Sequence, residues 1–559
     1  MRNPTQLSQV RRGRSELENH VIDEFVSGHI TRREFLRRGS IVGLSVPMLG
    51  AIVTACGGAN TSGSSGASAG AAAKPGASLK IASVVPTGAI NPLSIADEGG
   101  LTMLQQTGET LVFNNPHTNI LEPVLATSWK SNGAGDVWTF KLRDGVTFHN
   151  GQPMTADDVV YSFQAQTNPK VYVNASSVFT GVLTNDGVAK VDDRTVAFQL
   201  EAPNGNFPYL ISSDNYNMVI VPKGTDFDKW EKTFIGTGPF IMKTYQPKVG
   251  ASFSPNPHYW GGKVLPRGLQ FIFYPTQQPQ ILALQAGNVD IVNLIVPQGA
   301  EGVFNNPSYS LLVTKSSQHR ELSMRCDQAP WNNKLVRQAM ALSLNRPGIV
   351  NALYKQYAQL GNDHVFAPIF RSTDTSVPQR TQNLDKAKQL LASAGHPNGF
   401  STQLYTEDYQ EIPQYAQIIK QAAAAIGINI DLHVQSQADY YGDAVFGKSN
   451  WLDGAMSLVD YGHRGVPNVF LEAPLLSNGS WNAAHFKNAT YDGLVKSYVG
   501  ALDLGSQRHY AGQIERLLLD ETPLILAYWF DSMSVTKKGV AGVVTTGMGQ
   551  IYLNKAGLT

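Results

Sequence analysis

Apolar and polar positions alternate with two different periods along the chain, and each period predicts one type of element. Aromatic and aliphatic side chains at every second position over 137–143 indicate a half-buried strand. A strand is also predicted at 79–85, and two alternating runs within 188–200 predict a hairpin. Thr155 and Asp158 are spaced as in a capping box, in which each side chain satisfies a free backbone amide of the other residue, so a helix is expected to begin there.

Apolar residues at helical spacing recur in the second half of the chain. They predict four longer helices, at 334–344, 384–394, 412–426 and 507–521. Gly427 is expected to end the third helix, and the alternating residues 428–434 then form a strand. The apolar run 524–530 is long enough for one buried strand. Helices and strands in this succession indicate an α/β fold class, with mixed sheets flanked by helices.

The segment 31–56 has the order of an export signal. Arg32 and Arg33 precede an uncharged stretch of 17 residues, 39–55, and Val-Thr-Ala-Cys ends the segment at Cys56. The arginine pair resembles the twin-arginine (Tat) signal and the last four residues resemble a lipobox, which implies that Cys56 carries a lipid. An uncleaved transmembrane anchor is the alternative, but the stretch contains three glycines and a proline and is at the short limit for crossing a bilayer.

This signal implies a location outside the cytoplasm, in the periplasm or on the cell surface, with the membrane contacted through the lipid alone. Residues 57–77 are almost entirely Gly, Ser, Ala and Thr, which bury too little apolar surface to offset the entropy of ordering. We expect them to form a flexible linker. The folded part would then begin at Ser78 and is long enough for two or three domains.

Charge and cysteine content narrow the possible partners. Lys and Arg number 44 against 43 Asp and Glu, a net charge of +1, which argues against nucleic acid as a partner. The chain has 2 cysteines, so with Cys56 committed to lipid, Cys326 has no partner for an intramolecular disulfide. Cys326 is expected to be a small buried hydrophobic residue rather than a reactive thiol.

Motifs for catalysis or metal binding are missing from the sequence. It contains no His-Glu-x-x-His, no Cys-x-x-Cys and no phosphate-binding loop. Its 12 histidines are scattered, and no two of them have a metal-ligand spacing on one helix or strand face. We therefore expect no enzyme activity, no cofactor and no metal site.

Several blocks of the sequence together resemble the solute-binding proteins of peptide and nickel ABC importers, bacterial extracellular solute-binding protein family 5. They begin with VLATSW, WTFKLRDGVTFHNG and TADDV, and lie at 124–129, 138–151, 155–159, 236–240, 256–260, 284–291 and 336–346. Within these blocks a residue such as Arg337, taken as a cation on a helix face, specifies the fold rather than the ligand. The resemblance implies a large two-lobed periplasmic-binding-protein-like fold with an inserted subdomain, whose lobes close on a ligand.

The resemblance also implies how the chain is divided. The signal covers 1–56 and the linker 57–77. Lobe I is expected to be assembled from 78–104, 222–315 and 525–559, with 105–221 as its inserted subdomain and 316–524 as lobe II.

The segment that should touch the ligand lies in the expected lobe II. Val459-Asp460-Tyr461 and the stretch 478–486 are similar to the part of oligopeptide- and dipeptide-binding proteins that receives the α-ammonium of the ligand. This implies that Asp460 pairs with that ammonium, because a cation enclosed between two lobes loses its hydration and needs a fixed carboxylate. A helix-cap or hinge aspartate is the alternative. The other ligand-binding residues implied are Met456, Ser457 and Leu458, through main-chain hydrogen bonds, and Tyr461, Trp481 and Asn482.

The chain departs from the family pattern at two positions. Oligopeptide binders have an arginine six residues before the aspartate, where this chain has Gly454. Arg464 could replace it as the partner of a ligand carboxylate, although an exposed loop arginine is the favoured interpretation. Whether the ligand is a peptide therefore stays open, since the wider family also binds opines, saccharides, metal chelates and antibiotics.

The function that the resemblance implies is that of a lipid-anchored, extracytoplasmic solute-binding subunit of an ABC importer. It would act as a monomer, bind a short peptide or a related amine-bearing solute, and deliver it to the permease subunits in the membrane. The alternative of another class is a ligand-sensing receptor or a chaperone on the same fold.

Replacing both arginines of the signal, Arg32→Lys with Arg33→Lys, is expected to stop export, because the pair is the element that the Tat receptor reads. The measurement is the amount of mature protein in fractions outside the cytoplasm. Normal amounts there would show that the segment works as a general secretory signal.

Cys56→Ala is expected to give an unlipidated protein, because no thiol remains to carry the lipid. The variant should move to the aqueous phase in a detergent phase separation. A variant that stays in the detergent phase with the parent would show that the lipobox interpretation is wrong.

Overall fold

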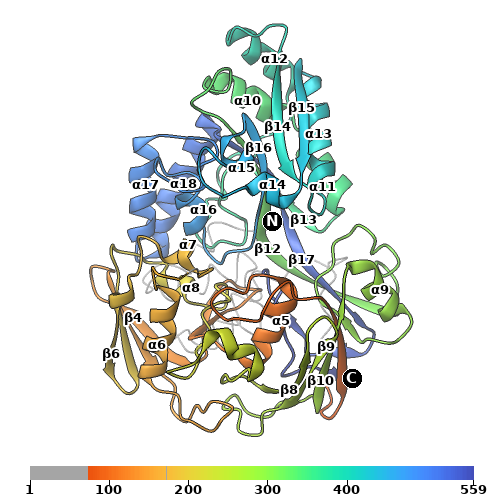
Figure 1. Cartoon of the computed structure of the whole chain (residues 1–559). Helices are drawn as coiled ribbons and strands as arrows, with labels where there is room; N and C mark the ends of the chain where they lie inside the picture. Colours follow the sequence, from red (N-terminus) through yellow and green to blue (C-terminus); the bar gives the residue numbers. More distant parts are fainter. Residues whose placement is uncertain (1–72, 172) are drawn as a thin grey trace, which may run out of the picture. The chain divides into compact units, whose positions relative to one another are not determined.

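Long strands with helices on both sides form one mixed sheet in the computed structural model, which describes residues 73–171 and 173–559 (Figure 1). The expected α/β fold class is confirmed. Within the described residues this sheet has 11 strands, in the order β15-β14-β16-β12-β17-β11-β1-β10-β9-β8, with β13 paired to β17 beside this path. Their bounds are β1 (Ser78–Val84), β8 (Phe240–Gln246), β9 (Gly250–Pro255), β10 (Gly268–Tyr274), β11 (Ile291–Val292), β12 (Tyr309–Met324), β13 (Ala358–Leu360), β14 (Phe400–Glu407), β15 (Ile428–Gln435), β16 (Met456–Tyr461) and β17 (Leu524–Lys537).

Smaller sheets and the helices complete the described part. A 4-stranded sheet contains β4 (Ala126–Ser131), β5 (Val137–Leu142), β7 (Thr195–Gln199) and β6 (Val188–Asp192). Three strand pairs are β2 (Val112–Asn114) with β3 (Leu121–Pro123), β18 (Val540–Ala541) with β21 (Gly557–Leu558), and β19 (Val544–Thr545) with β20 (Ile551–Tyr552). The helices are α5 (Glu98–Thr107), α6 (Ala156–Gln166), α7 (Ser176–Phe179), α8 (Phe207–Leu210), α9 (Gln277–Gln285), α10 (Lys334–Ser343), α11 (Arg346–Tyr354), α12 (Leu384–Ser393), α13 (Ile412–Ala424), α14 (Gln437–Tyr441), α15 (Asn450–Asp453), α16 (Asn468–Glu472), α17 (Ala489–Gly500) and α18 (Leu504–Glu521), with 3-10 turns η1 (Asn185–Gly187) and η2 (Phe227–Lys232).

The two ends of the main sheet have separate hydrophobic cores, which define two lobes (Figure 1). Lobe I contains β1 and β8–β11, against which α5 packs. Lobe II contains β13–β16, with α10–α13 on one face and α14–α18 on the other. Side chains of β16 point alternately to the two faces of the sheet. Met456 and Leu458 pack against α10–α13, whereas Val459 and Tyr461 pack on the side of α14–α18. The two-lobed architecture is thus the one that was expected.

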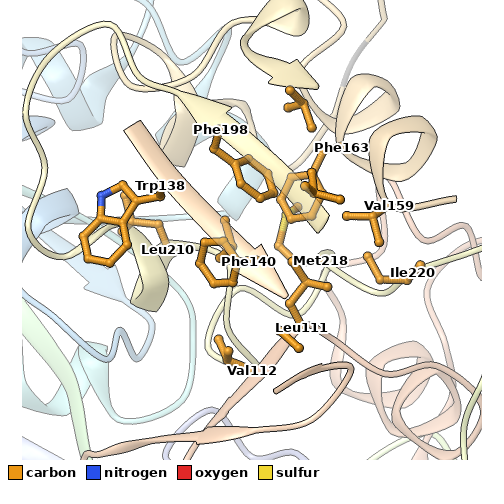
Figure 2. Packing of buried hydrophobic residues seen from close by; sticks show 14 of the residues in the cluster. Leu111, Val112, Trp138, Phe140, Val159, Phe163, Phe198, Leu210, Met218 and Ile220 are labelled. Atoms are coloured by element: carbon orange, nitrogen blue, oxygen red, sulfur yellow. The ribbon is translucent and has the colours of Figure 1, made fainter. Parts of the chain in front are cut away.

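The 4-stranded sheet and its helices α6–α8 have a core of their own, which we call the inserted subdomain (Figure 2). This core draws most of its residues from Leu111 to Ile220, and Phe198 meets Phe140 and Phe163 edge to face within it. The predicted elements are confirmed here: β5 buries every second residue, β6 and β7 form the hairpin, and α6 begins at the capping box, where the Thr155 amide donates to Asp158 Oδ2 at 2.7 Å.

Two strands, β12 and β17, run through both lobes and pair with each other along their length. Phe530 packs in lobe II, whereas Met533 and Val535 pack in lobe I, so β17 crosses between the lobes at 530–532. The expected boundary at 524/525 is therefore wrong for this crossing. The predicted buried strand 524–530 is longer in the structure: β17 has 14 residues, because its first half packs in the core of lobe II and its second half in the core of lobe I.

The N-terminal boundary of lobe I also differs from the expectation. The Lys74 amide donates to the Leu558 carbonyl at 2.7 Å, and the Gly76 amide donates to the Leu265 carbonyl at 2.9 Å. Residues 73–77 are thus part of lobe I rather than linker. Arg32, Arg33 and Cys56 lie outside the described residues.

Arg337 of α10 is a buried cation that bonds to the fold itself, as expected of a residue that specifies the fold. Its side chain, 3% exposed, donates to the carbonyls of Glu521, Thr522 and Trp331 at 2.6–3.1 Å. These include the carbonyls at the C-terminal end of α18, which have no partner within the helix. Arg337 therefore caps α18 and joins it to α10.

Candidate functional site

Asp460 lies near the end of β16, directly opposite Arg320 of β12. Its side chain is 31% exposed, and its Oδ1 accepts a hydrogen bond from Arg320 Nη1. The second carboxylate oxygen has no hydrogen-bond partner among the described residues. Asp460 is therefore partly exposed to solvent, while one of its carboxylate oxygens is bonded to a buried guanidinium.

The guanidinium of Arg320 is fully buried and already has a carboxylate partner in Glu411, at the start of α13. Arg320 Nε donates to Glu411 Oε1 at 2.8 Å, and Nη2 donates to Glu411 Oε2 at 3.1 Å. Tyr528 also donates to Glu411 Oε1, at 2.9 Å, and the Phe530 ring lies 4.5 Å from the guanidinium carbon. The pKa of Glu411 is lowered, because the attraction of Arg320 outweighs the effect of burial. Arg320 and Glu411 are therefore both ionised at neutral pH.

The charges of the cluster do not balance. Arg320 contributes one positive charge, and Glu411 and Asp460 contribute one negative charge each, which leaves a surplus of one negative charge. Glu411 is 1% exposed and compensates Arg320, so the surplus resides on the more exposed Asp460. The site is suited to a cation that approaches from the open side.

The main chain of Met456, Ser457 and Leu458 is not free to bind an extended ligand. Each of these residues pairs with β12 on one side and with β14 on the other. Their side chains are at most 1% exposed, so the expected ligand contacts of these three residues are not supported by their positions. The cause is that β16 is an interior strand of the sheet along this stretch.

The pairing of β16 with β14 ends at Leu458, opposite Thr406. The Leu458 carbonyl accepts a hydrogen bond from the Thr406 hydroxyl at 3.0 Å, so it faces β14. Main-chain groups face the same side at every second residue of a strand. The amide and carbonyl of Asp460 therefore face the edge of β16 just beyond the last paired residue of β14.

The other three expected site residues differ in their surroundings. Trp481 is partly buried and packs 6.1 Å from Tyr461, ring centre to ring centre, on the side of an open cavity. Tyr461 is 6% exposed and stacks on His319, so it supports Trp481 from behind. Asn482 is 3% exposed and bonds within its own loop, to the carbonyls of Leu476 and Phe486. Of the three, Trp481 reaches the cavity wall.

The cavity beside Trp481 has a volume of about 170 Å³ and lies between the inserted subdomain and lobe II. The subdomain contributes polar and aromatic residues to its wall, and lobe II contributes the loop that follows β16 together with α16. The lining includes Tyr209, Asp214, Asn215, Tyr216, Asn217, Arg464, Val466, Val469 and Trp481.

Arg464 is part of this wall and is not an exposed loop arginine, so the favoured interpretation of that residue is wrong. Its Nε is buried and has no hydrogen-bond partner, and its Nη1 donates to the carbonyl of His463 at 2.8 Å. The loop folds inward because Val466 and Val469 pack into the core of the inserted subdomain. The alternation pattern of the sequence gave no sign of this packing.

Direct contacts hold the inserted subdomain against lobe II around the cavity. Asn119 Nδ2 donates to the Gly465 carbonyl at 2.9 Å, and the Gly205 amide donates to the Val499 carbonyl at 2.8 Å. Asn206 Nδ2 donates to Asn468 Oδ1 at 2.8 Å. These short polar contacts join the inserted subdomain to lobe II around the cavity.

A second cavity, of about 250 Å³, lies beside Glu109 in lobe I. Glu109 accepts hydrogen bonds from Tyr259 at 2.7 Å, Trp260 at 2.8 Å and Thr237 at 2.9 Å. Burial raises the pKa of Glu109 to about 7, although these hydrogen bonds act in the opposite direction. Both oxygens of this carboxylate already accept hydrogen bonds from side chains of the protein, so Glu109 is not a candidate for ligand binding.

Within 73–171 and 173–559, no group of three or more His, Cys, Asp or Glu side chains is arranged to hold a metal ion. In the same residues, no helix has both the length and the apolar character needed to cross a membrane. Burial raises the pKa of the Cys326 thiol to about 11, and the side chain is partly buried. The thiol is therefore protonated and unreactive at neutral pH.

Two lobes joined by paired crossing strands, one of them carrying an inserted subdomain, form the fold of periplasmic solute-binding proteins. The chain belongs to the bacterial extracellular solute-binding proteins, family 5, whose middle region matches residues 121–473. The solute-binding role expected from the sequence is thereby confirmed, and it is the role that such proteins have in ABC importers.

Curated relatives cover most of the chain. The heme-binding protein A of Haemophilus influenzae is 28% identical over 458 residues, which is 75% of this chain and 81% of the relative. The dipeptide-binding protein of Escherichia coli is 25% identical over 468 residues, which is 78% of this chain and 86% of the relative. Among solved structures, HbpA2 from Haemophilus parasuis has a TM-score of 0.75 and 25% identity, and the match covers 86% of this chain and 100% of that one.

Arg320→Met is expected to destabilise lobe II by roughly 3–5 kcal/mol, because it leaves the buried Glu411 carboxylate without its partner. The double variant Arg320→Met with Glu411→Gln should recover much of the loss, since no buried charge then remains unpaired. Urea unfolding of the parent and the variants measures both effects.

Lys334→Met serves as the matched control, because Lys334 pairs with Asp520 at 2.7 Å on the surface of the same lobe. Breaking this exposed pair should cost less than about 1 kcal/mol. A double variant as unstable as Arg320→Met alone would contradict the buried ion pair between Arg320 and Glu411.

Proposed function

We propose that the protein captures a short peptide, or a related amine-bearing solute, between its lobes and delivers it to the permease of an ABC importer. The observation that carries this proposal is the surplus negative charge on Asp460, whose Oδ2 accepts no hydrogen bond from the described residues. An ammonium group of the solute would restore the charge balance of the cluster formed by Arg320, Glu411 and Asp460. Arg320 contributes by holding the Asp460 carboxylate ionised and in one orientation.

The edge of β16 beyond Leu458 supports a peptide rather than a simple amine. The main-chain amide and carbonyl of Asp460 face that edge, where β14 no longer supplies partners. An extended peptide could continue the sheet there and bond through its main chain, which does not depend on its side chains. This replaces the contacts first expected of Met456, Ser457 and Leu458.

Closure of the lobes is the step that couples binding to delivery. A solute that contacts both lobes favours the closed state by the difference in its affinity for the two states. The polar contacts of Asn119 and Asn206 with lobe II then add to that preference. The permease would recognise the closed form, and a lipid on Cys56 would keep a monomeric protein close to it.

The names of the relatives give two ligand classes. The Escherichia coli relative is a dipeptide-binding protein, and a relative in Pseudomonas aeruginosa is a di/tripeptide-binding protein. The Haemophilus influenzae relative is a heme-binding protein, so heme is the second candidate. Heme has no ammonium group and would leave the surplus negative charge of the cluster uncompensated, which favours the peptide.

Asp460→Asn is expected to weaken binding of a free tripeptide by about 10- to 100-fold, or roughly 1.4–2.8 kcal/mol. The expected loss of affinity is smaller than for a fully buried ion pair, because Asp460 is 31% exposed and Arg320 already compensates part of its charge. The measurement is calorimetric titration with the tripeptide that binds the parent most tightly in a thermal-shift screen, repeated with its N-acetylated form.

Asp431→Asn is the matched control, since it removes one charge from an exposed aspartate of the same lobe, 70% accessible, and should leave affinity unchanged. Acetylation should weaken binding to the parent but not further weaken binding to Asp460→Asn. Equal affinity of the parent for the free and the acetylated peptide would refute an ammonium site, and binding of heme without any free peptide would support the second candidate.

A further inference from the structure

The cavity of about 250 Å³ beside Glu109 shares no residue with the charged cluster of Arg320, Glu411 and Asp460. Lobe I contributes the end of α5, residues 259–260 and the C-terminal strands β19 and β20 to its wall, and the inserted subdomain contributes β2 and β3. Of the described residues that line it, none belongs to lobe II. This cavity is therefore complete without a contribution from lobe II.

Aromatic rings make up much of its wall. Phe113 meets Tyr552 edge to face at 5.2 Å between ring centres, and the ring centre of Tyr259 lies 5.5 Å from that of Trp260. The Tyr259 hydroxyl and the Trp260 indole nitrogen donate to Glu109 at 2.7 and 2.8 Å, so these two donors are used and their rings are held in place. The remaining apolar lining consists of Pro123, Val124, Val219 and Val544. The wall thus matches an apolar, ring-shaped molecule.

One buried polar group of the wall has no partner. Gln105 is 5% exposed, and its Oε1 is buried without a hydrogen-bond partner among the described residues. The other buried polar side chains of the wall are engaged by the protein: the Thr110 hydroxyl donates to a main-chain carbonyl at 2.7 Å, the Ser213 hydroxyl accepts from a main-chain amide at 2.9 Å, and Gln550 Nε2 donates to the Ser213 carbonyl at 2.9 Å. A buried carbonyl without a donor is costly. The cavity therefore lacks one hydrogen-bond donor, at Gln105.

We propose that this cavity is a second small-molecule site, which binds an uncharged aromatic compound of one or two rings whose N–H or O–H group donates to Gln105 Oε1. An apolar cavity of roughly 150 Å³ already accepts benzene, and pockets for larger ligands begin at roughly 300 Å³. The volume of about 250 Å³ lies between these limits, so one or two rings fit it. This site goes beyond the proposed function and does not depend on it.

The charges around the cavity favour an uncharged occupant. Glu109 and Glu122 belong to the wall and repel an anion. The guanidinium carbon of Arg143 lies 4.3 Å from the centre of the Trp260 ring, so this ring already has a cation as its partner. The single unused acceptor on Gln105 is neutral and needs a donor, not a charge.

An occupant of this cavity would contact the hairpin of β19 and β20. Residues of this hairpin that line the cavity are Val544, Gln550 and Tyr552. The turn of the same hairpin bonds to the crossing strand β12, since the Ser316 hydroxyl and Gln318 Nε2 both donate to the Gly547 carbonyl at 2.9 Å. The site therefore lies under a segment that contacts the strand joining the lobes.

The first test compares indole with indene, which has nearly the same shape but a CH₂ group in place of the N–H. Ligand-observed NMR titration gives the ratio of the two affinities for each protein. Gln105→Leu keeps the size of the side chain and removes the acceptor, so its ratio should favour indole less than that of the parent by roughly three- to tenfold. Gln389→Leu, which changes an exposed glutamine of α12, should have the ratio of the parent.

The second test fills the cavity. Val544 lines it and is 37% exposed, so Val544→Trp should abolish binding of both probes while the ligand-free variant keeps its melting temperature. Val191→Trp is the matched control, because Val191 of β6 is 61% exposed and does not line the cavity. This variant should bind both probes as the parent does.

Four results would overturn the site. Indole that does not bind the parent up to its solubility limit would show that water alone satisfies Gln105. The same affinity ratio in the parent and in Gln105→Leu would remove the hydrogen bond, and unchanged binding to Val544→Trp would place the probe elsewhere. Indole-3-carboxylate that binds as tightly as indole would contradict an uncharged ligand. None of these results uses the tripeptide, so the proposed capture of a peptide stands or fails separately.

Discussion

The pairing of β12 with β17 is the constraint on which the rest of the structure depends. The two strands pair from Tyr309 with Lys537 at one end to Ser323 with Leu524 at the other, and each passes through the core of both lobes. The lobes share these strands, so neither core can be completed without them. The register shift between Thr314 and Gln318 gives the shared ladder a local irregularity at the crossing, where bending costs fewer hydrogen bonds.

The same strand organises the charges of the binding site. Arg320 lies on the lobe II side of this register shift and bonds Asp460, whereas Ser317 lies within the shift and bonds the main chain of Arg464. Because β12 also belongs to lobe I, both residues lie close to the segment that joins the lobes.

Local pattern was sufficient for elements whose partners are near in sequence. The alternation of β5 and the capping box of α6 predict the observed elements because a strand face or a helix start is determined by a few adjacent residues. The burial of Arg337 and of Arg464 could not be predicted, for the opposite reason. Their surroundings come from segments distant in sequence, which no periodicity records: Arg337 meets the end of α18, 184 residues later, and the loop of Arg464 packs into the inserted subdomain. The resemblance pointed to Asp460, but it did not reveal that Met456, Ser457 and Leu458 are paired with a strand on each side.

The path of the chain also determines the order in which the lobes are completed. Lobe II needs residues up to β17, whereas lobe I also needs Ile551, Leu553 and Ala556, which pack with Leu79 and Ile81 from the opposite end of the folded part. A growing chain thus presents the strands of lobe II as a nearly complete set while the core around Leu79 and Ile81 still lacks these last residues. Contacts that span almost the whole sequence are slow to form. Lobe I is therefore the last part of the molecule to become compact, and its exposed strands are the surface that the cell must protect until synthesis ends.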